Sequence, residues 1–178
     1  MIRGIIISVL EGVIKRFSAS GRAGETFTDR EYFQHYGYTS RPKSGAEGII
    51  FREGNHIIMI ASDDRRYRIA LEEGEVALYD HQGQVIKLKD GKEVHIYGCD
   101  KLTADVAVET KITCPLVRLV ASAKVRIESP LLEVTGEIKD RCDSTGRSMS
   151  EMRQVYNSHT HPENNTTGGS TNAPTQGM

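Results

Sequence analysis

The chain has 178 residues, a net charge of −1, 38% hydrophobic residues and no Trp. The balance of 23 basic against 24 acidic side chains argues against a general nucleic-acid binder, which needs an excess of Lys and Arg. No apolar run approaches the roughly 20 residues of a membrane-spanning helix, and three widely spaced Cys are expected to be reduced thiols in a protein made in the cytosol.

Short apolar runs bounded by turn residues fill the chain from residue 1 to about residue 80. Segments 5–9, 48–51 and 56–61 are rich in β-branched residues, as strands are. Segment 53–55, Glu-Gly-Asn, predicts a hairpin between the last two, because Gly and Asn tolerate a positive φ. The pattern predicts a small barrel or sandwich of five or six strands.

From about residue 85 to residue 138, the apolar residues stand two apart, which is the side-chain period of a strand. A Gly91 turn separates the first two of these segments. The phase of the alternation switches at Pro115 and again at Pro130, and a Pro cannot donate a hydrogen bond to a strand ladder. We therefore expect a corner at each Pro, in a chain that winds around an axis.

These predicted strands have one apolar face and one charged face. The apolar face needs a cover, and the strand edges need partners. Identical chains winding together provide both, and three chains make a prism. A sandwich within a single chain would use the same alternation, so the pattern alone leaves both arrangements open.

The tail, residues 141–178, is rich in Ser, Thr, Asn and Gly, a composition typical of disorder. Within it, His159 and His161 stand two apart, which places both imidazoles on the same side of an extended chain. Neutral imidazole is a common metal ligand, and three copies of the pair on a threefold axis would offer six nitrogens, which fill an octahedral shell as a structural site. Such a pair in a polar tail is also often adventitious.

Gly168 and Gly169 allow a tight reversal after His161, so we expect the last ten residues to fold back.

A second interpretation of the tail adds Glu163 as a third ligand. Two His and one carboxylate in one chain form the arrangement of non-haem iron oxygenases. Pro162 bends the chain between these ligands, and the polar tail offers little for a substrate pocket, so a small metalloenzyme is the weaker interpretation. The other histidines are expected to be surface or packing residues: His35, His56, His81 and His95.

Several spaced motifs carry a resemblance to a known family. They occupy residues 33–47, 61–68, 74–80, 148–153 and 156–161. Together they resemble the Mu-like phage baseplate assembly protein V family, whose members are central tail spikes, and the resemblance spans nearly the whole chain.

The resemblance implies an all-β homotrimer with three parts. An OB-type (oligonucleotide/oligosaccharide-binding) barrel is expected at residues 1–82, an intertwined triple-stranded β-helix at residues 83–140 and a pointed tip at residues 141–178. The resemblance further implies one iron ion per trimer, held by His159 and His161 of each chain as six His ligands. It also allows chloride and calcium ions on the axis.

The function that the resemblance implies is mechanical, with no catalytic residues and no nucleic-acid partner. The chain is expected in the virion tail baseplate, after assembly in the host cytoplasm. Its barrel would dock on the baseplate hub protein, and its tip would pierce the host outer membrane when the sheath contracts. Family members usually have a further segment before the first strand, so we expect a truncated N-terminus. The alternatives are an OB-fold module that binds nucleic acid or carbohydrate, and the small non-haem metalloenzyme.

Overall fold

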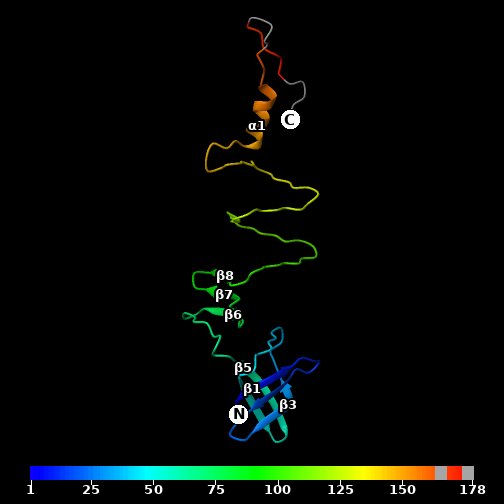
Figure 1. The fold of residues 1–178 in the computed structure, drawn as a ribbon, viewed down its shortest axis with the longest axis vertical. Helices are drawn as coiled ribbons and strands as arrows, with labels where there is room; N and C mark the ends of the chain where they lie inside the picture. Colours follow the sequence, from blue (N-terminus) through cyan, green and yellow to red (C-terminus); the bar gives the residue numbers. More distant parts are fainter. Residues whose placement is uncertain (163–167, 174–178) are drawn as a thin grey trace. The chain divides into compact units, whose positions relative to one another are not determined.

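The structure is a computed structural model that describes residues 1–162 and 168–173. The chain divides into two units, residues 1–110 and residues 111–178, which Figure 1 colours along the sequence. The elements in chain order are β1 (Ile2–Leu10), β2 (Arg16–Ser20), β3 (Thr26–Tyr32), β4 (Glu47–Glu53), β5 (His56–Asp63), β6 (Val76–Tyr79), β7 (Val85–Lys89), β8 (Glu93–Tyr97) and α1 (Met149–Ser158). In the described part of the chain, no helix has the length and hydrophobicity of a membrane span.

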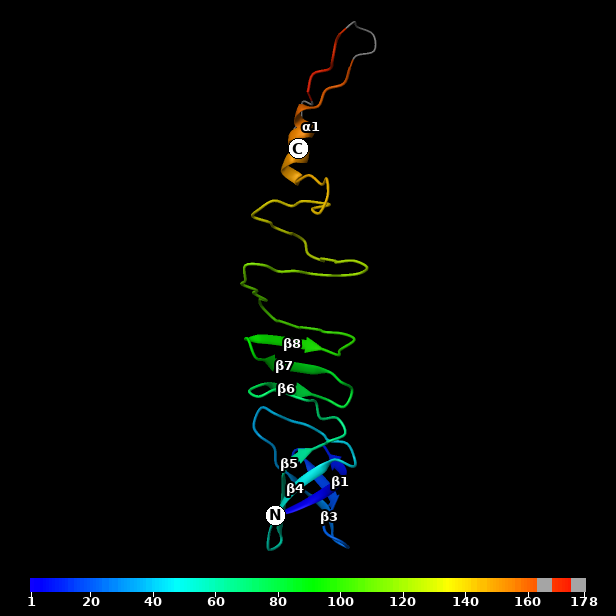
Figure 2. The same cartoon turned by 90° about the vertical axis from the view of Figure 1, so that its left-hand side faces the viewer.

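Strands β1 to β5 close into a barrel in the order β1-β2-β3-β5-β4, with β4 pairing back onto β1. Neighbouring strands are antiparallel except β3 and β5, which run parallel. Figure 2 shows these strands wrapped around a common interior. The β4–β5 hairpin turns at Gly54, whose φ is 57°. The predicted small barrel is confirmed, and its strand order fits a five-stranded Greek-key barrel of the OB type.

The core of the barrel is built by one chain alone. Its most deeply buried large side chains are Phe17, Ile6, Ile50 and Met59, each at most 1% exposed. At Gly4, the backbone of β1 lies so close to its neighbours that an added Cβ would stand 2.7 Å from the Ser20 carbonyl oxygen and 2.8 Å from Ile50 Cδ1. A side chain at this position would therefore push β1 away from β2.

Strands β6, β7 and β8 form a separate antiparallel sheet, seen as three adjacent ribbons in Figure 2. The predicted turn at Gly91 is confirmed, since Lys89 pairs with Glu93 across it. The register places six apolar side chains on one face, each 43–63% exposed: Val76, Leu78, Ile86, Leu88, Val94 and Ile96. We call this set the apolar sheet face.

In the second unit, residues 111–147 follow wide turns without forming a strand ladder within the single chain (Figure 1). The backbone bends at residues 114–115 and at Pro130, where corners were predicted. The alternating apolar side chains of this segment are 44–73% exposed: Ile112, Val117, Leu119, Val125, Ile127, Leu132, Val134 and Ile138. The triple-stranded β-helix therefore stays a prediction, because its ladders would run between chains.

The tail contains a helix that its composition does not suggest. The Ser148 hydroxyl accepts a hydrogen bond from the Glu151 N–H at 3.2 Å, and the Glu151 carboxylate accepts one from the Ser148 N–H at 2.7 Å. This capping box satisfies two backbone donors at the start of α1. An ordered helix therefore lies within a segment whose composition is typical of disorder, and the fold is nearly all-β rather than all-β.

Candidate metal centre and interaction surfaces

His159 stands at the C-terminal end of α1, which fixes both its backbone and its ring. Its N–H donates to the Val155 carbonyl oxygen at 3.0 Å, which continues the helical pattern. Its ring Nδ1 lies 2.6 Å from the Tyr156 carbonyl oxygen. A carbonyl oxygen can only accept, so Nδ1 carries the hydrogen and the lone pair of the neutral ring is on Nε2. His159 is therefore oriented to bind a metal through Nε2.

His161 is held by a segment that returns from beyond residue 167. The His161 N–H donates to Thr171 Oγ1 at 2.9 Å, and the Thr171 N–H donates to the His161 carbonyl oxygen at 2.8 Å. Pro162 and Ser170 form an antiparallel bridge beside them, and Gly168 has a φ of 83°. The predicted reversal of the chain after His161 is confirmed for residues 168–173, while its last five residues lie outside the described part.

The two rings lie together, with centroids 5.1 Å apart and planes at 87°. Imidazoles that share one ion through bonds of about 2.1 Å have ring centres roughly 4.5–6.5 Å apart, and the separation of this pair falls within that range. Across residues 1–162 and 168–173, no three His, Cys, Asp or Glu side chains gather into a metal-binding group. Glu163, the third ligand of the metalloenzyme interpretation, lies outside these residues. One described chain therefore offers two ligands.

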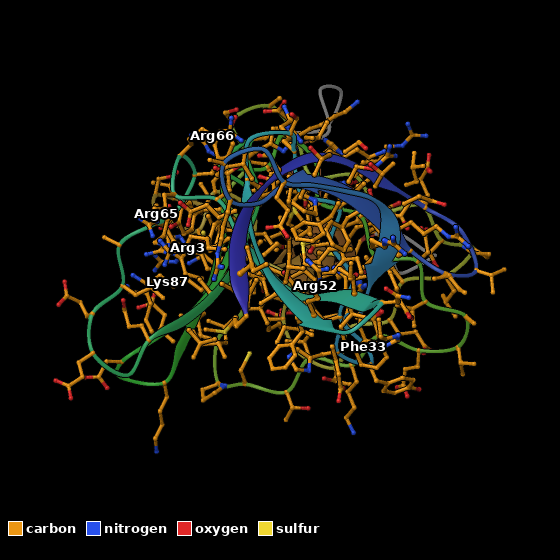
Figure 3. The ribbon with its side chains drawn as sticks, turned by 90° about the horizontal axis from the view of Figure 1, so that it is seen from below. Arg3, Phe33, Arg52, Arg65, Arg66 and Lys87 are labelled. Carbon is orange, nitrogen blue, oxygen red and sulfur yellow. The ribbon has the colours of Figure 1, made fainter. Side chains whose placement is uncertain are left out.

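The barrel surface carries arginines whose charges are paired with nearby carboxylates. Arg3 and Arg65 both approach the Glu47 carboxylate, at 3.8 and 3.3 Å. Figure 3 shows Arg3, Arg65 and Arg66 on the same side of the barrel. Arg66 donates to Asp64 at 2.7 Å, and this hydrogen bond lowers the pKa of the Asp64 carboxyl. A single-stranded nucleic acid needs free cations beside stacking aromatics, which these pairs do not offer.

A cavity of about 690 Å³ lies in the first unit beside the loop at residues 37–43. Its lining includes Tyr38, Tyr67 and Tyr79, a set of aromatic rings that could suit a sugar. Two of its carboxylates, Asp63 and Asp64, are already paired with Arg68 and Arg66. These two carboxylates are therefore engaged in ion pairs within the chain.

Helix α1 carries a second exposed apolar surface, which we call the helix stripe. Its residues stand three or four apart and are 38–47% exposed: Met149, Met152, Val155 and Tyr156. None of the helix is buried within its own chain. The sequence motifs include Met149, Met152 and Tyr156 but predict no helix, although the Ser148-x-x-Glu151 capping signature marks its start. Thr171 was also missed, and no local pattern marks it.

Comparison with known proteins gives two findings. Residues 3–66 match the family model described as bacteriophage Mu Gp45, N-terminal, and this region contains nearly all of the five-stranded barrel. The chain is also 32% identical over 114 residues to the baseplate puncturing device gp45 of Escherichia phage Mu. The similarity covers 61% of this chain and 49% of that protein, so the chain spans about half the length of its curated relative.

Both findings agree with the barrel topology and with the resemblance carried by the sequence motifs. The expected kinship with phage baseplate spike proteins is confirmed. Residues 3–66 are therefore similar to the N-terminal domain of the bacteriophage Mu Gp45 family, and the chain resembles a phage baseplate spike protein.

Proposed function

We propose that the chain is the central spike of a contractile phage tail, a homotrimer that pierces the host outer membrane when the sheath contracts. In this proposal the barrel docks on the baseplate hub protein, and the C-terminal tip is the first part of the spike to enter the host outer membrane. The relative named a baseplate puncturing device supports the location in the virion tail baseplate. Assembly in the host cytoplasm and a purely structural, non-enzymatic role belong to the same proposal.

The observation that carries the proposal is the apolar sheet face. Six aliphatic side chains on three adjacent strands, each 43–63% exposed, form a contiguous patch that a lone soluble chain would not normally leave open. The apolar alternation continues beyond β8 to Ile138 with similar exposure. Three such faces turned inward would enclose a narrow core, which suits side chains of this size.

A closed three-chain shaft also suits a piercing role. Segment 111–147 satisfies few of its backbone groups within one chain, and winding with two copies would pair them and remove free strand edges. All backbone groups would then be bonded in a rod with no exposed edge. Such a rod resists bending when it is pushed.

The proposed apex site consists of His159 and His161 from each of three chains. Two ligands per chain and three chains make six, the number that an octahedral iron ion takes. A bound ion would crosslink the chains and add its binding free energy to the folded state. Chloride and calcium ions on the axis belong to the proposal without assigned residues.

Solution mass tests the trimer directly. Light scattering on the full chain should give about 59 kDa, three times the 19.8 kDa of one chain. Ile96→Glu places a charge on the apolar sheet face and should shift the mass toward one chain. His95→Glu, the neighbouring position on the opposite face, is the matched control and should keep the trimer. A wild-type mass of one chain would refute the proposal.

Metal content separates the structural site from the enzyme alternative. One ion per three chains is expected, and His159→Ala with His161→Ala should abolish metal binding while the shaft keeps the trimer. One ion per chain would favour the non-haem metalloenzyme instead.

Gold-labelled antibodies against the chain should decorate the baseplate end of tail particles, and labelling elsewhere would contradict the proposed location.

A further inference from the structure

Both backbone polar groups of His161 are bonded to a single residue, Thr171. The hydroxyl of Thr171 accepts from the His161 N–H at 2.9 Å, and the Thr171 N–H donates to the His161 carbonyl oxygen at 2.8 Å. One of these bonds uses a side chain, so it depends on the residue type at position 171. The other uses only the backbone and would survive any substitution except Pro.

We propose that Thr171 is a positioning residue for the metal centre. Its hydroxyl holds the backbone of His161 so that the imidazole stands beside that of His159 before an ion arrives. This inference rests on the proposed metal centre and adds to it a residue that touches no ion.

The remaining restraints on the pair explain why one hydroxyl matters. His159 is fixed by α1, through the Val155 carbonyl oxygen at its N–H and the Tyr156 carbonyl oxygen at its ring. His161 precedes Pro162, which confines its backbone to extended conformations but does not fix its direction. The contact to Thr171 supplies that direction, and the resulting ring separation is 5.1 Å.

Preorganisation of this kind sets metal affinity. Groups that orient a ligand without touching the metal typically contribute a factor of about 10–100 to affinity. Without the hydroxyl, the His161 N–H would bond to water and only the backbone bond from the Thr171 N–H would hold His161, so the chain after Thr160 would also sample directions in which the two rings diverge. Metal binding would then have to fix the direction of the chain at His161, and the conformational entropy lost in doing so would lower the affinity.

The test compares three variants of the full, metal-stripped protein. Thr171→Val keeps the shape of the side chain but lacks the hydroxyl, Thr171→Ser restores it, and Thr145→Val makes the same change at an exposed threonine before α1. Ferrous iron is titrated without oxygen against a chromogenic chelator. Thr171→Val should bind about 10–100-fold more weakly. The Ser variant and Thr145→Val should match the wild type.

Cobalt(II) absorption supplies a second readout that a general loss of stability would not reproduce. The visible bands should change in Thr171→Val, because the ligand geometry changes, and return in Thr171→Ser. Unchanged affinity and bands in Thr171→Val would overturn the role of Thr171 alone, with the metal centre intact. A wild-type protein that binds no iron would overturn the proposed metal centre and this inference with it.

Discussion

The ammonium group of Lys15 donates a hydrogen bond to the side-chain oxygen of Gln34 over 2.9 Å. The same group reaches Thr39 Oγ1 at 2.7 Å and the Ser40 carbonyl oxygen at 2.8 Å, and only 11% of the Lys15 side chain is exposed. Gln34 in turn donates to the Ser40 carbonyl oxygen at 2.9 Å. Lys15 therefore holds the long connection between β3 and β4 against the barrel.

Replacing Lys15 should loosen this connection and destabilise the barrel. Lys15→Met keeps the length of the side chain but removes the donor that ties Gln34, Thr39 and the Ser40 carbonyl oxygen to the barrel, although Gln34 Oε1 keeps its hydrogen bonds from the Thr39 hydroxyl and the Ser40 N–H. We expect a loss of about 1–3 kcal/mol in the free energy of unfolding, measured by denaturant titration of tyrosine fluorescence. Lys101→Met, on an exposed lysine, is the control and should change little. Equal stability of the two variants would contradict the role of Lys15.

Packing at Gly4 gives a second prediction. Gly4→Ala places a Cβ 2.7 Å from the Ser20 carbonyl oxygen, a backbone atom that cannot move aside without disturbing β2. We expect about 1–3 kcal/mol of destabilisation, read from the same titration. Gly12→Ala is the matched control, because its Cβ would meet its nearest atom at an ordinary 3.4 Å. A neutral Gly4→Ala would show that β1 and β2 are less tightly joined than the structure indicates.

The ion pair between Glu75 and Lys87 predicts a loss of stability in acid. Lys87 Nζ lies 2.6 Å from the Glu75 carboxylate, whose side chain is 5% exposed. The hydrogen bond from Lys87, followed by one from the Glu72 N–H, lowers the pKa of Glu75 below its ordinary 4.5. A carboxyl whose pKa is lower in the folded than in the unfolded chain stabilises the fold fully above the unfolded value. This contribution disappears as the pH falls through the folded value.

Glu75→Gln should therefore weaken the acid dependence of the melting temperature. Thermal unfolding is followed between about pH 6 and about pH 3, where the wild type should lose more stability than the variant. Glu73→Gln changes an exposed neighbour in the same way and should retain the wild-type slope. Parallel curves for Glu75→Gln and the wild type would show that the pair does not couple folding to pH.

The helix stripe predicts that α1 depends on neighbouring copies of the chain. An isolated helix of ten residues is marginal in water, and α1 buries no residue in its own chain. Met152→Glu puts a charge into the stripe and should speed amide exchange throughout α1. Gln154→Glu, two residues further along the helix, introduces the same charge on the other side and should leave exchange unchanged. Fast exchange in the wild type would contradict packing of the stripe.

Local signals in the sequence predicted the barrel well. Strands β1, β4 and β5 coincide with β-branched runs, and Gly54 marks the hairpin between the last two. These features depend on residues that are close to one another in the sequence, so they could be predicted without a structure. The parallel pairing of β3 with β5 closes the barrel and has no comparable local mark.

The tail was harder to predict, for two physical reasons. Its composition is polar, and composition hides a short helix whose start is marked only by Ser148 and Glu151. The contact between His161 and Thr171 joins residues across a reversal, and hydroxyl residues are too frequent in the tail for one to stand out. The histidine pair itself was evident from its spacing, whereas the groups that orient it were not.

The barrel core is formed by residues of one chain, whereas the shaft of the proposed trimer needs three chains. Folding of the barrel and association of the chains therefore differ in reaction order. Burial of Phe17 and Met59 needs no second copy, so the barrel can form at any dilution and at a rate independent of protein concentration. Covering the apolar sheet face in the proposed trimer requires encounters between chains, so that stage slows steeply on dilution. Refolding at low concentration should therefore accumulate single chains with finished barrels and open sheet faces.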